Sequence, residues 1–135
     1  MADVSITPAN VLKGSDALDE DGLAGATIEA GQVVYKDSDS KFQLTDTDSG
    51  TAAAKVAYGI ALNGAADGQP LKVQRGGRIT IGGTLVPGTA YYASETPGGI
   101  QPGTDLATED VAFLGHAVDA AVLDLRIYNT GVTVA

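Results

Sequence analysis

Large and small residues alternate along short runs of this chain. In residues 56–62 the side chains of Val56, Tyr58, Ile60 and Leu62 alternate with alanine and glycine. Because successive side chains of a β-strand point to opposite faces, this spacing predicts a strand with one bulky and one small face. The small face favours close approach of another backbone or sheet. No segment keeps helical periodicity over three turns, so helix is expected to be a minor component.

Polar stretches separate the β-prone runs and predict turns. A hairpin is expected to join residues 32–35 and 42–45 through the polar loop 37–41. Further strands are expected at 90–93, 111–118 and 122–128, and a short strand or tail at 131–135. A short strand or extended arm is expected at 3–7, and single helical turns within 46–54 and 103–110.

Glycines predict a second, tighter hairpin. Gly76 and Gly77 supply the positive φ that a two-residue turn between 71–75 and 78–81 needs. Residues 13–26 contain several glycines and an acidic run, and we expect them to form a solvated surface loop. Many short strands joined by such turns indicate an all-β fold, a compact β-sandwich or barrel of short antiparallel strands.

The chain repeats one pattern in order. The motif G-x-T-(I/L)-x-x-G-x-x-x-Y occurs at 25–35 and again at 82–92. The matching segments continue with 56–62 and 112–118, and with 70–73 and 122–125. A duplicated unit of about 55 residues indicates a scaffold rather than a catalytic pocket. We therefore expect a single β-rich domain over 1–135, with an N-terminal arm and acidic loop at 1–24 and repeated halves at about 25–81 and 82–135.

Composition narrows the classes of function. The chain has no Trp and two Phe, so its core is lean in large side chains, and burial between subunits is a natural supplement. A net charge of −9 opposes binding to the phosphates of nucleic acid. The absence of cysteine excludes disulfides, thiolate zinc sites and cysteine nucleophiles. The first residues do not resemble a signal peptide and no apolar run could form a membrane helix, so we expect synthesis in the cytoplasm and no membrane partner.

Candidate catalytic and metal-binding residues are few. His116 is the sole histidine, and its place in the repeat predicts a partly buried strand residue bonded to backbone or to a neighbouring subunit. A pH-responsive contact is the alternative, because histidine titrates near neutrality. Residues 37–39 and 46–50 resemble the start of a calcium loop but lack the later glutamate, which favours turns that bond their own backbone. We expect no enzymatic activity, no metal and no cofactor.

Three bases lie close together in this acidic chain. Lys72, Arg75 and Arg78 fall within the predicted tight hairpin. They form either a solvated hairpin tip or an electrostatic docking site for an acidic surface, which would orient a partner more than it adds affinity.

Five segments carry a family resemblance. They are 25–37, 58–63, 67–73, 82–92 and 97–102. Together they resemble the small head-decoration or capsid-cement proteins of tailed bacteriophages. The resemblance implies a β-rich fold, attachment to the outer face of an assembled capsid, frequently a trimer at local three-fold positions, and neither cofactor nor enzymatic activity.

The resemblance leads to specific expectations. The partners would be the major capsid protein and further copies of the chain, as a homotrimer, and the protein would lie on the virion exterior after synthesis in the cytoplasm of the host bacterium. A phage tail or fibre component, or an adhesin-like module that binds host glycans, is the alternative. An extended arm can add a strand to a neighbour, so the expected capsid interface comprises Asp3, Val4, Ser5, Ile6, Thr7 and Pro8 together with Lys72, Arg75 and Arg78.

Overall fold

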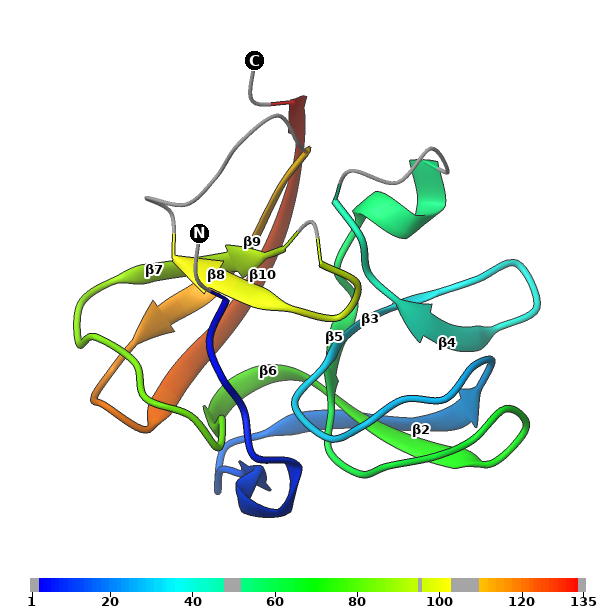
Figure 1. Cartoon of the computed structure of the whole chain (residues 1–135), viewed down its shortest axis with the longest axis horizontal. Coiled ribbons are helices and arrows are strands. Elements are labelled where there is room, and N and C mark those ends of the chain that lie inside the picture. Colours follow the sequence, from blue (N-terminus) through cyan, green and yellow to red (C-terminus); the bar gives the residue numbers. More distant parts are fainter. Residues whose placement is uncertain (1–2, 48–51, 95, 103–109, 134–135) are drawn as a thin grey trace.

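The computed structural model describes residues 3–47, 52–94, 96–102 and 110–133. These residues are nearly all in strands and turns, which confirms the all-β prediction (Figure 1). None of the described helices is long and apolar enough to cross a membrane. The strands are β1 (Leu12–Lys13), β2 (Leu18–Ala24), β3 (Val33–Lys36), β4 (Lys41–Leu44), β5 (Gly59–Ala61), β6 (Pro70–Thr80), β7 (Ala90–Ala93), β8 (Ile100–Pro102), β9 (Asp110–Ala117) and β10 (Val122–Thr133). Two 3-10 turns, η1 (Pro8–Asn10) and η2 (Ala52–Lys55), complete the elements.

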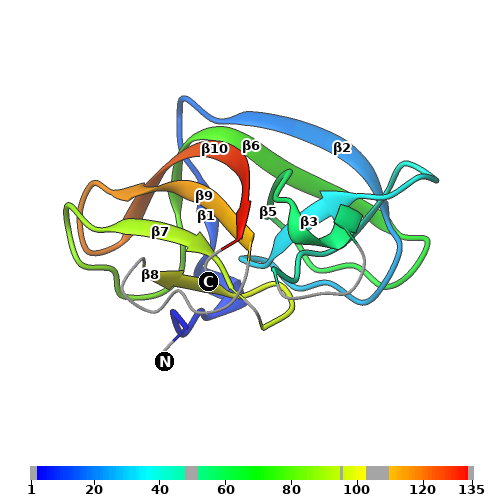
Figure 2. The same ribbon diagram turned by 90° about the horizontal axis from the view of Figure 1, so that it is seen from above.

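Strand β6 connects two groups of strands. The sheet runs in the order β2-β4-β3-β5-β6-β10-β9-β7-β8, and β2 also pairs with β6. The extra pairing closes β2, β4, β3, β5 and β6 into a small barrel. Strands β10, β9, β7 and β8 continue from β6 as a second group, so that Figure 2 shows two lobes with β6 between them.

The two groups share one strand plan. The order β4-β3-β5-β6 returns as β8-β7-β9-β10. The register returns as well, since Val34 lies opposite Gly59 in the first group and Tyr91 opposite Gly115 in the second. The predicted hairpin at 32–45 is present as β3 and β4, and its counterpart is β7 and β8.

The second glycine of the repeated motif has the same structural role in both copies. Gly31 and Gly88 have φ values of 92° and 82°, the left-handed region that glycine adopts without steric cost. Their N–H groups donate to the carbonyl oxygens of Ala61 and Ala117, at 2.8 and 2.9 Å. Each copy of the motif thus turns the chain and hydrogen-bonds it to the strand that pairs with β3 or β7, namely β5 or β9.

The third segment of the repeat is offset from its prediction. Ile60 pairs with Gln74, and the corresponding His116 pairs with Asp124. Gln74 therefore corresponds to Asp124, which moves the match of 70–73 with 122–125 by two residues. The sequence match rested on apolar identity alone, whereas hydrogen-bonded register sets the true correspondence.

The predicted tight hairpin at Gly76 and Gly77 is wrong. Strand β6 runs without reversal from Pro70 to Thr80, and Gly77, at φ 84°, marks a bend within it. The Gln74 side-chain amide donates to the carbonyl oxygens of Gly76, at 3.0 Å, and of Arg78, at 2.8 Å, on either side of this bend. A left-handed glycine serves a bulge as well as a turn, and here pairing on both edges of β6 selects the bend.

The predicted acidic loop at 13–26 is also wrong for most of its length. Residues 18–24 form β2, in which Asp19 lies opposite Gln74 and Asp21 opposite Lys72. Acidic residues are poor strand formers in isolation. In β2, ion pairs with basic residues of the neighbouring β6 offset the low strand propensity of the acidic residues.

Two apolar cores lie on either side of β3 and β5. Val33 and Ile60 point into the larger core, and Val34 and Ala61 point into the barrel. The alternation predicted for 56–62 holds for Ile60, Ala61 and Leu62 but is wrong for the two residues before β5, because Ala57 packs in the larger core and Tyr58 against the barrel core. The strand itself is limited to β5. The barrel interior is completed by Ala24, Ile28, Phe42, Ala65, Leu71 and Val73.

Replacement of the buried strand glycines should destabilise both lobes. A Cβ atom at Gly59 would lie less than 3.0 Å from the carbonyl oxygen of Gln74, and one at Gly115 less than 3.0 Å from that of Asp124. We expect Gly59→Ala and Gly115→Ala each to lower the free energy of unfolding by about 2 kcal/mol, measured by urea denaturation. Gly64→Ala is the control, because its Cβ would meet no atom closer than 3.7 Å. Equal midpoints for all three variants would contradict this packing.

Candidate functional site: the outer face at the bend of β6

The three predicted docking bases do not form one positive patch. Lys72 lies 3.6 Å from Asp21, and Arg75 lies 3.7 Å from Glu20, so carboxylates of β2 compensate both. Arg78 makes no ion pair with any residue in the described part of the chain. The bend in β6, rather than a hairpin, separates it from the other two.

Glu20 forms a compact ionic cluster beside the barrel. Its carboxylate accepts hydrogen bonds from Lys36 Nζ and from the Tyr58 hydroxyl, the latter at 2.7 Å. Lys36 and Arg75 also lie over the Tyr58 ring, 5.3 and 4.1 Å from its centroid. The hydrogen bond from Lys36, followed by that from Tyr58, lowers the pKa of Glu20. The same bond raises the pKa of Lys36. The cluster connects β2 with β3, with Tyr58 just before β5, and with β6.

Strand register brings His116 and Arg78 into one row. Asp124 of β10 lies opposite Arg78 on one side and opposite His116 on the other. Directly opposed residues of antiparallel strands share a face, so the three side chains lie on the outer face of the sheet. His116 is exposed there, which corrects the prediction of a partly buried histidine. The correspondence with Ile60 led to this wrong prediction. Ile60 points into the larger core, whereas the His116 side chain points into solvent.

A second row, apolar except for Thr80, lies beside this charged row. Leu12 is opposite Thr80, and Thr80 is opposite Val122. The N–H of Val118 donates to the carbonyl oxygen of Val122, at 2.9 Å, which places Val118 at the end of the row. Leu12 is 62% exposed and Val118 43%. We call these two rows, Leu12, Arg78, Thr80, His116, Val118, Val122 and Asp124, the β6–β10 face.

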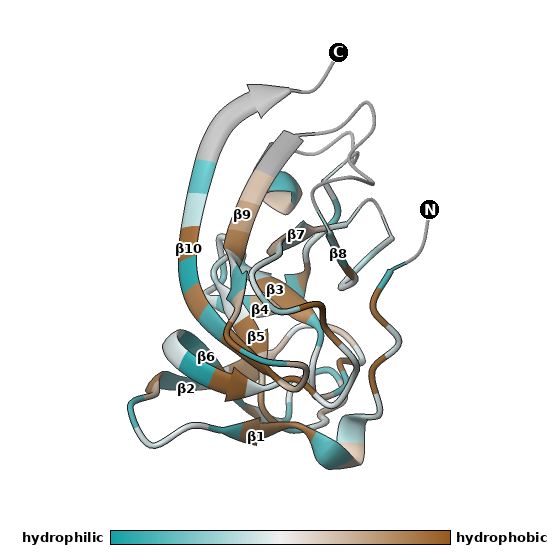
Figure 3. Cartoon of the chain, turned by 90° about the vertical axis from the view of Figure 1, so that its left-hand side faces the viewer, coloured by the Kyte–Doolittle hydropathy of each residue, from teal (hydrophilic) through white to brown (hydrophobic). Residues whose placement is uncertain are grey.

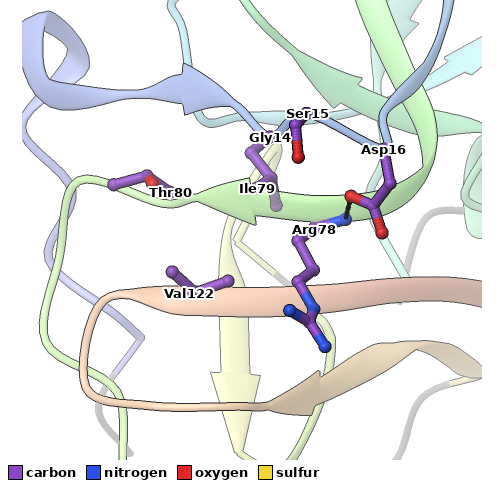
Figure 4. Close-up of a pocket in the computed structure, with 7 residues that line it drawn as sticks. All are labelled: Gly14, Ser15, Asp16, Arg78, Ile79, Thr80 and Val122. Carbon is purple, nitrogen blue, oxygen red and sulfur yellow. Dashed lines mark hydrogen bonds between the residues drawn. The ribbon is translucent and has the colours of Figure 1, made fainter.

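Two hollows indent this side of the molecule. The first, of about 300 Å³, is bounded by residues of the β1–β2 connection, β6 and Val122 (Figure 4). Figure 4 shows the Arg78 side chain directed from β6 toward β10, while its backbone N–H donates to Asp16 Oδ1 at 2.9 Å. The second hollow has about 400 Å³ and lies over Gly76 and Gly77, with Leu18 at its edge. Because glycines leave no side chain to fill it, the bend itself creates this hollow.

The N-terminal segment is bound within its own chain. The N–H of Val4 donates to the carbonyl oxygen of Ile100 at 2.7 Å, and that of Thr7 to Gly82 at 2.9 Å. Val4 and Ile6 pack against the larger core, and Figure 3 shows this apolar segment running alongside the body of the molecule. Residues 3–7 are extended as predicted but are not a free arm, because their apolar side chains find a partner in the domain itself.

Of the two acidic segments that resemble the start of a calcium loop, residues 37–39 are fully described. Asp37 Oδ1 accepts the N–H groups of Asp39 and Lys41, at 2.9 and 3.0 Å, which confirms the turn interpretation for 37–39. A hydrogen bond from Gln43 lowers the pKa of Asp37. Residues 48–50 of the second candidate, and 103–109 of the expected helical turn, lie outside the described residues. Within the described chain, no group of three or more histidine, aspartate or glutamate residues is arranged to hold a metal ion.

Sequence reasoning missed most of the β6–β10 face. Leu12, Val122 and Asp124 belong to three different strands, and their proximity depends on β6 lying between β1 and β10. No local motif encodes that proximity. The one available signal, which the sequence analysis did not use, is the alternation of charged and apolar residues in 122–128, which is typical of a strand with Asp124 and Arg126 on its solvent face.

Comparison with models of known protein families and with curated protein sequences gave no match. The site is therefore interpreted from its own geometry.

The ionic cluster predicts how stability depends on pH. The lowered pKa of Glu20 means that its contribution is complete above the unfolded carboxyl value of about 4.3 and is lost as the pH falls through the folded value. We expect Glu20→Gln to cost about 1 kcal/mol at pH 7, a modest figure because water still screens the cluster. The difference from wild type should shrink below about pH 4 in urea denaturation. A difference that is constant from pH 7 to pH 3 would contradict the ion pair.

The packed N-terminal segment predicts a loss of intrinsic stability on mutation. Ile6→Ala should lower the urea midpoint of the isolated protein, because Ile6 contacts the larger core and lies against Gly31. We expect a cost of about 1–2 kcal/mol, since Ile6 is only partly buried. Ser5→Ala, at an exposed position of the same segment, is the control. An unchanged midpoint for Ile6→Ala would return the segment to the role of a free arm.

Proposed function

We propose that this protein is a structural virion protein that binds the outer surface of a bacteriophage capsid and stabilises it. The observation that carries the proposal is the β6–β10 face, a sheet surface on which apolar side chains are left in water next to an unpaired arginine. Exposed apolar residues grouped on one surface are typical of sites that bind another protein. Leu18, at the edge of the second hollow, is 70% exposed and extends this surface.

The scaffold behind the face suits a mechanical role. Strand β6 lies under the face and pairs with β1, β2, β5 and β10. A force applied at the face therefore meets hydrogen bonds in both lobes. Such a scaffold can bridge neighbouring shell subunits without rearrangement, which is the physical requirement for a cement protein.

The placement of the N-terminal segment changes the proposed mode of attachment. The N–H groups of Val4 and Thr7 already donate hydrogen bonds within the domain. Strand addition by residues 3–8 is therefore not needed for binding in this proposal. The β6–β10 face takes that role. Self-association as a homotrimer remains part of the proposal, supported by the lean core and by the 66% exposure of Tyr128 on β10. A solution mass equal to one chain would contradict it.

Thermal release of DNA from phage heads tests the proposal. Heads of the phage that encodes this chain, stripped of the protein and then redecorated with it, should rupture at a higher temperature than stripped heads. The physical reason is that bridging contacts must break before shell subunits separate. Rupture is measured by the fluorescence of a DNA-binding dye during heating.

An unrelated acidic protein of similar size, added to the same stripped heads, is the control. Equal rupture temperatures with and without this protein would contradict the stabilising role. Binding to a glycan array, together with density on the tail rather than the head in electron micrographs, would instead establish the alternative of a host-binding tail component.

A further inference from the structure

Arg78 stands apart from the other bases that the structure describes on this side of the molecule. Lys13, Lys72, Arg75 and Arg126 each pair with a carboxylate. The Arg78 guanidinium has no ion pair, hydrogen bond or ring contact with any described residue, although it borders the first hollow. A cation held in this way is available to a partner at little cost in lost internal contacts.

The two aspartates beside Arg78 in the structure, Asp16 and Asp124, each accept a hydrogen bond from another group. Asp16 Oδ1 accepts the backbone N–H of Arg78 at 2.9 Å. Asp124 Oδ2 accepts from Arg126 Nε at 3.1 Å, and the Asp124 side chain is only 17% exposed. Of the three arginines that line the two hollows, Arg75 and Arg126 pair with Glu20 and Asp124, so Arg78 is the one left without an ionic partner among the described residues. The electrostatic complement of this surface is an anion.

The surroundings of Arg78 define what kind of anion fits. Thr80 and Val122 line the same hollow, and the exposed Leu12 lies opposite Thr80 on the neighbouring strand β1. A free inorganic anion would leave the aliphatic side chains of Leu12 and Val122 in water. A protein segment that carries a carboxylate beside an aliphatic side chain would cover them and pair with the guanidinium, whose planar fork matches a carboxylate.

We propose that the hollow between the β1–β2 connection and β10 is the site at which this protein docks onto the shell, and that its ligand is a shell-protein segment with an aspartate or glutamate next to an aliphatic residue. This inference rests on the proposed function and deepens it. Arg78 supplies the charge, and Leu12 and Val122 supply the apolar contact.

Binding of variants to stripped phage heads tests the inference. We expect Arg78→Gln to raise the Kd measured by cosedimentation about tenfold and to remove most of its dependence on salt concentration. Leu12→Ser should weaken binding by a similar factor while leaving the salt dependence unchanged. Lys41→Gln, a cation of β4, and Val56→Ser, an apolar residue before β5, are the matched controls and should bind like wild type. Urea denaturation midpoints of all four variants verify that folding is intact. For Arg78→Gln we expect an unchanged midpoint, because the guanidinium has no partner among the described residues.

The outcomes separate the two proposals. If wild type binds and Arg78→Gln binds with the same Kd and the same salt dependence, the docking site is wrong and the capsid role stands. If wild type does not bind stripped heads, both are contradicted. If Arg78→Glu weakens binding more than Arg78→Gln, and Leu12→Ser weakens it while Val56→Ser does not, the site and the chemistry of its ligand are established.

Discussion

The structure depends on the pairing of β6 along both of its edges. Residues 73 and 74 pair with β2 on one edge and β5 on the other, and residues 79 and 80 pair with β1 and β10. A buried backbone group without a hydrogen-bond partner is costly, so a strand that serves both lobes must find partners on each side of its bend. Gly77 permits the bend, and the Gln74 side chain bonds the two carbonyls that flank it.

The same bend shapes the surface. Two glycines in succession leave β6 without side chains above its midpoint, and the larger hollow lies there. The bend also separates Arg78 from Arg75, so that one arginine joins the ionic cluster around Glu20 and the other borders the open hollow. The feature that lets one strand serve two lobes thus also creates the surface to which we assign binding.

Charge in this protein is organised rather than merely abundant. The acids of β2 lie across from the bases of β6, and Glu20 alone contacts Lys36, Arg75 and the Tyr58 hydroxyl. These pairs make an acidic segment a stable strand. Because Lys72 and Arg75 are paired with these carboxylates, Arg78 is the basic residue of the β6–β10 face that is available to a partner.

By itself the sequence determined the local features that need only neighbouring residues. Period-2 alternation predicted the buried strand around Ile60, the repeated glycine motif predicted two similar turns, and Asp37 predicted its own turn. Tertiary structure alone decided whether Gly77 would reverse the chain or bend β6. It also decided whether the acidic residues 19–21 would form a strand and whether another part of the chain would cover His116. Each of these outcomes depends on which strand lies alongside, and strand partners are distant in sequence, so no local pattern encodes them. The site has the same origin, because register across β1, β6, β10 and β9 is what brings Leu12, Arg78 and Asp124 together.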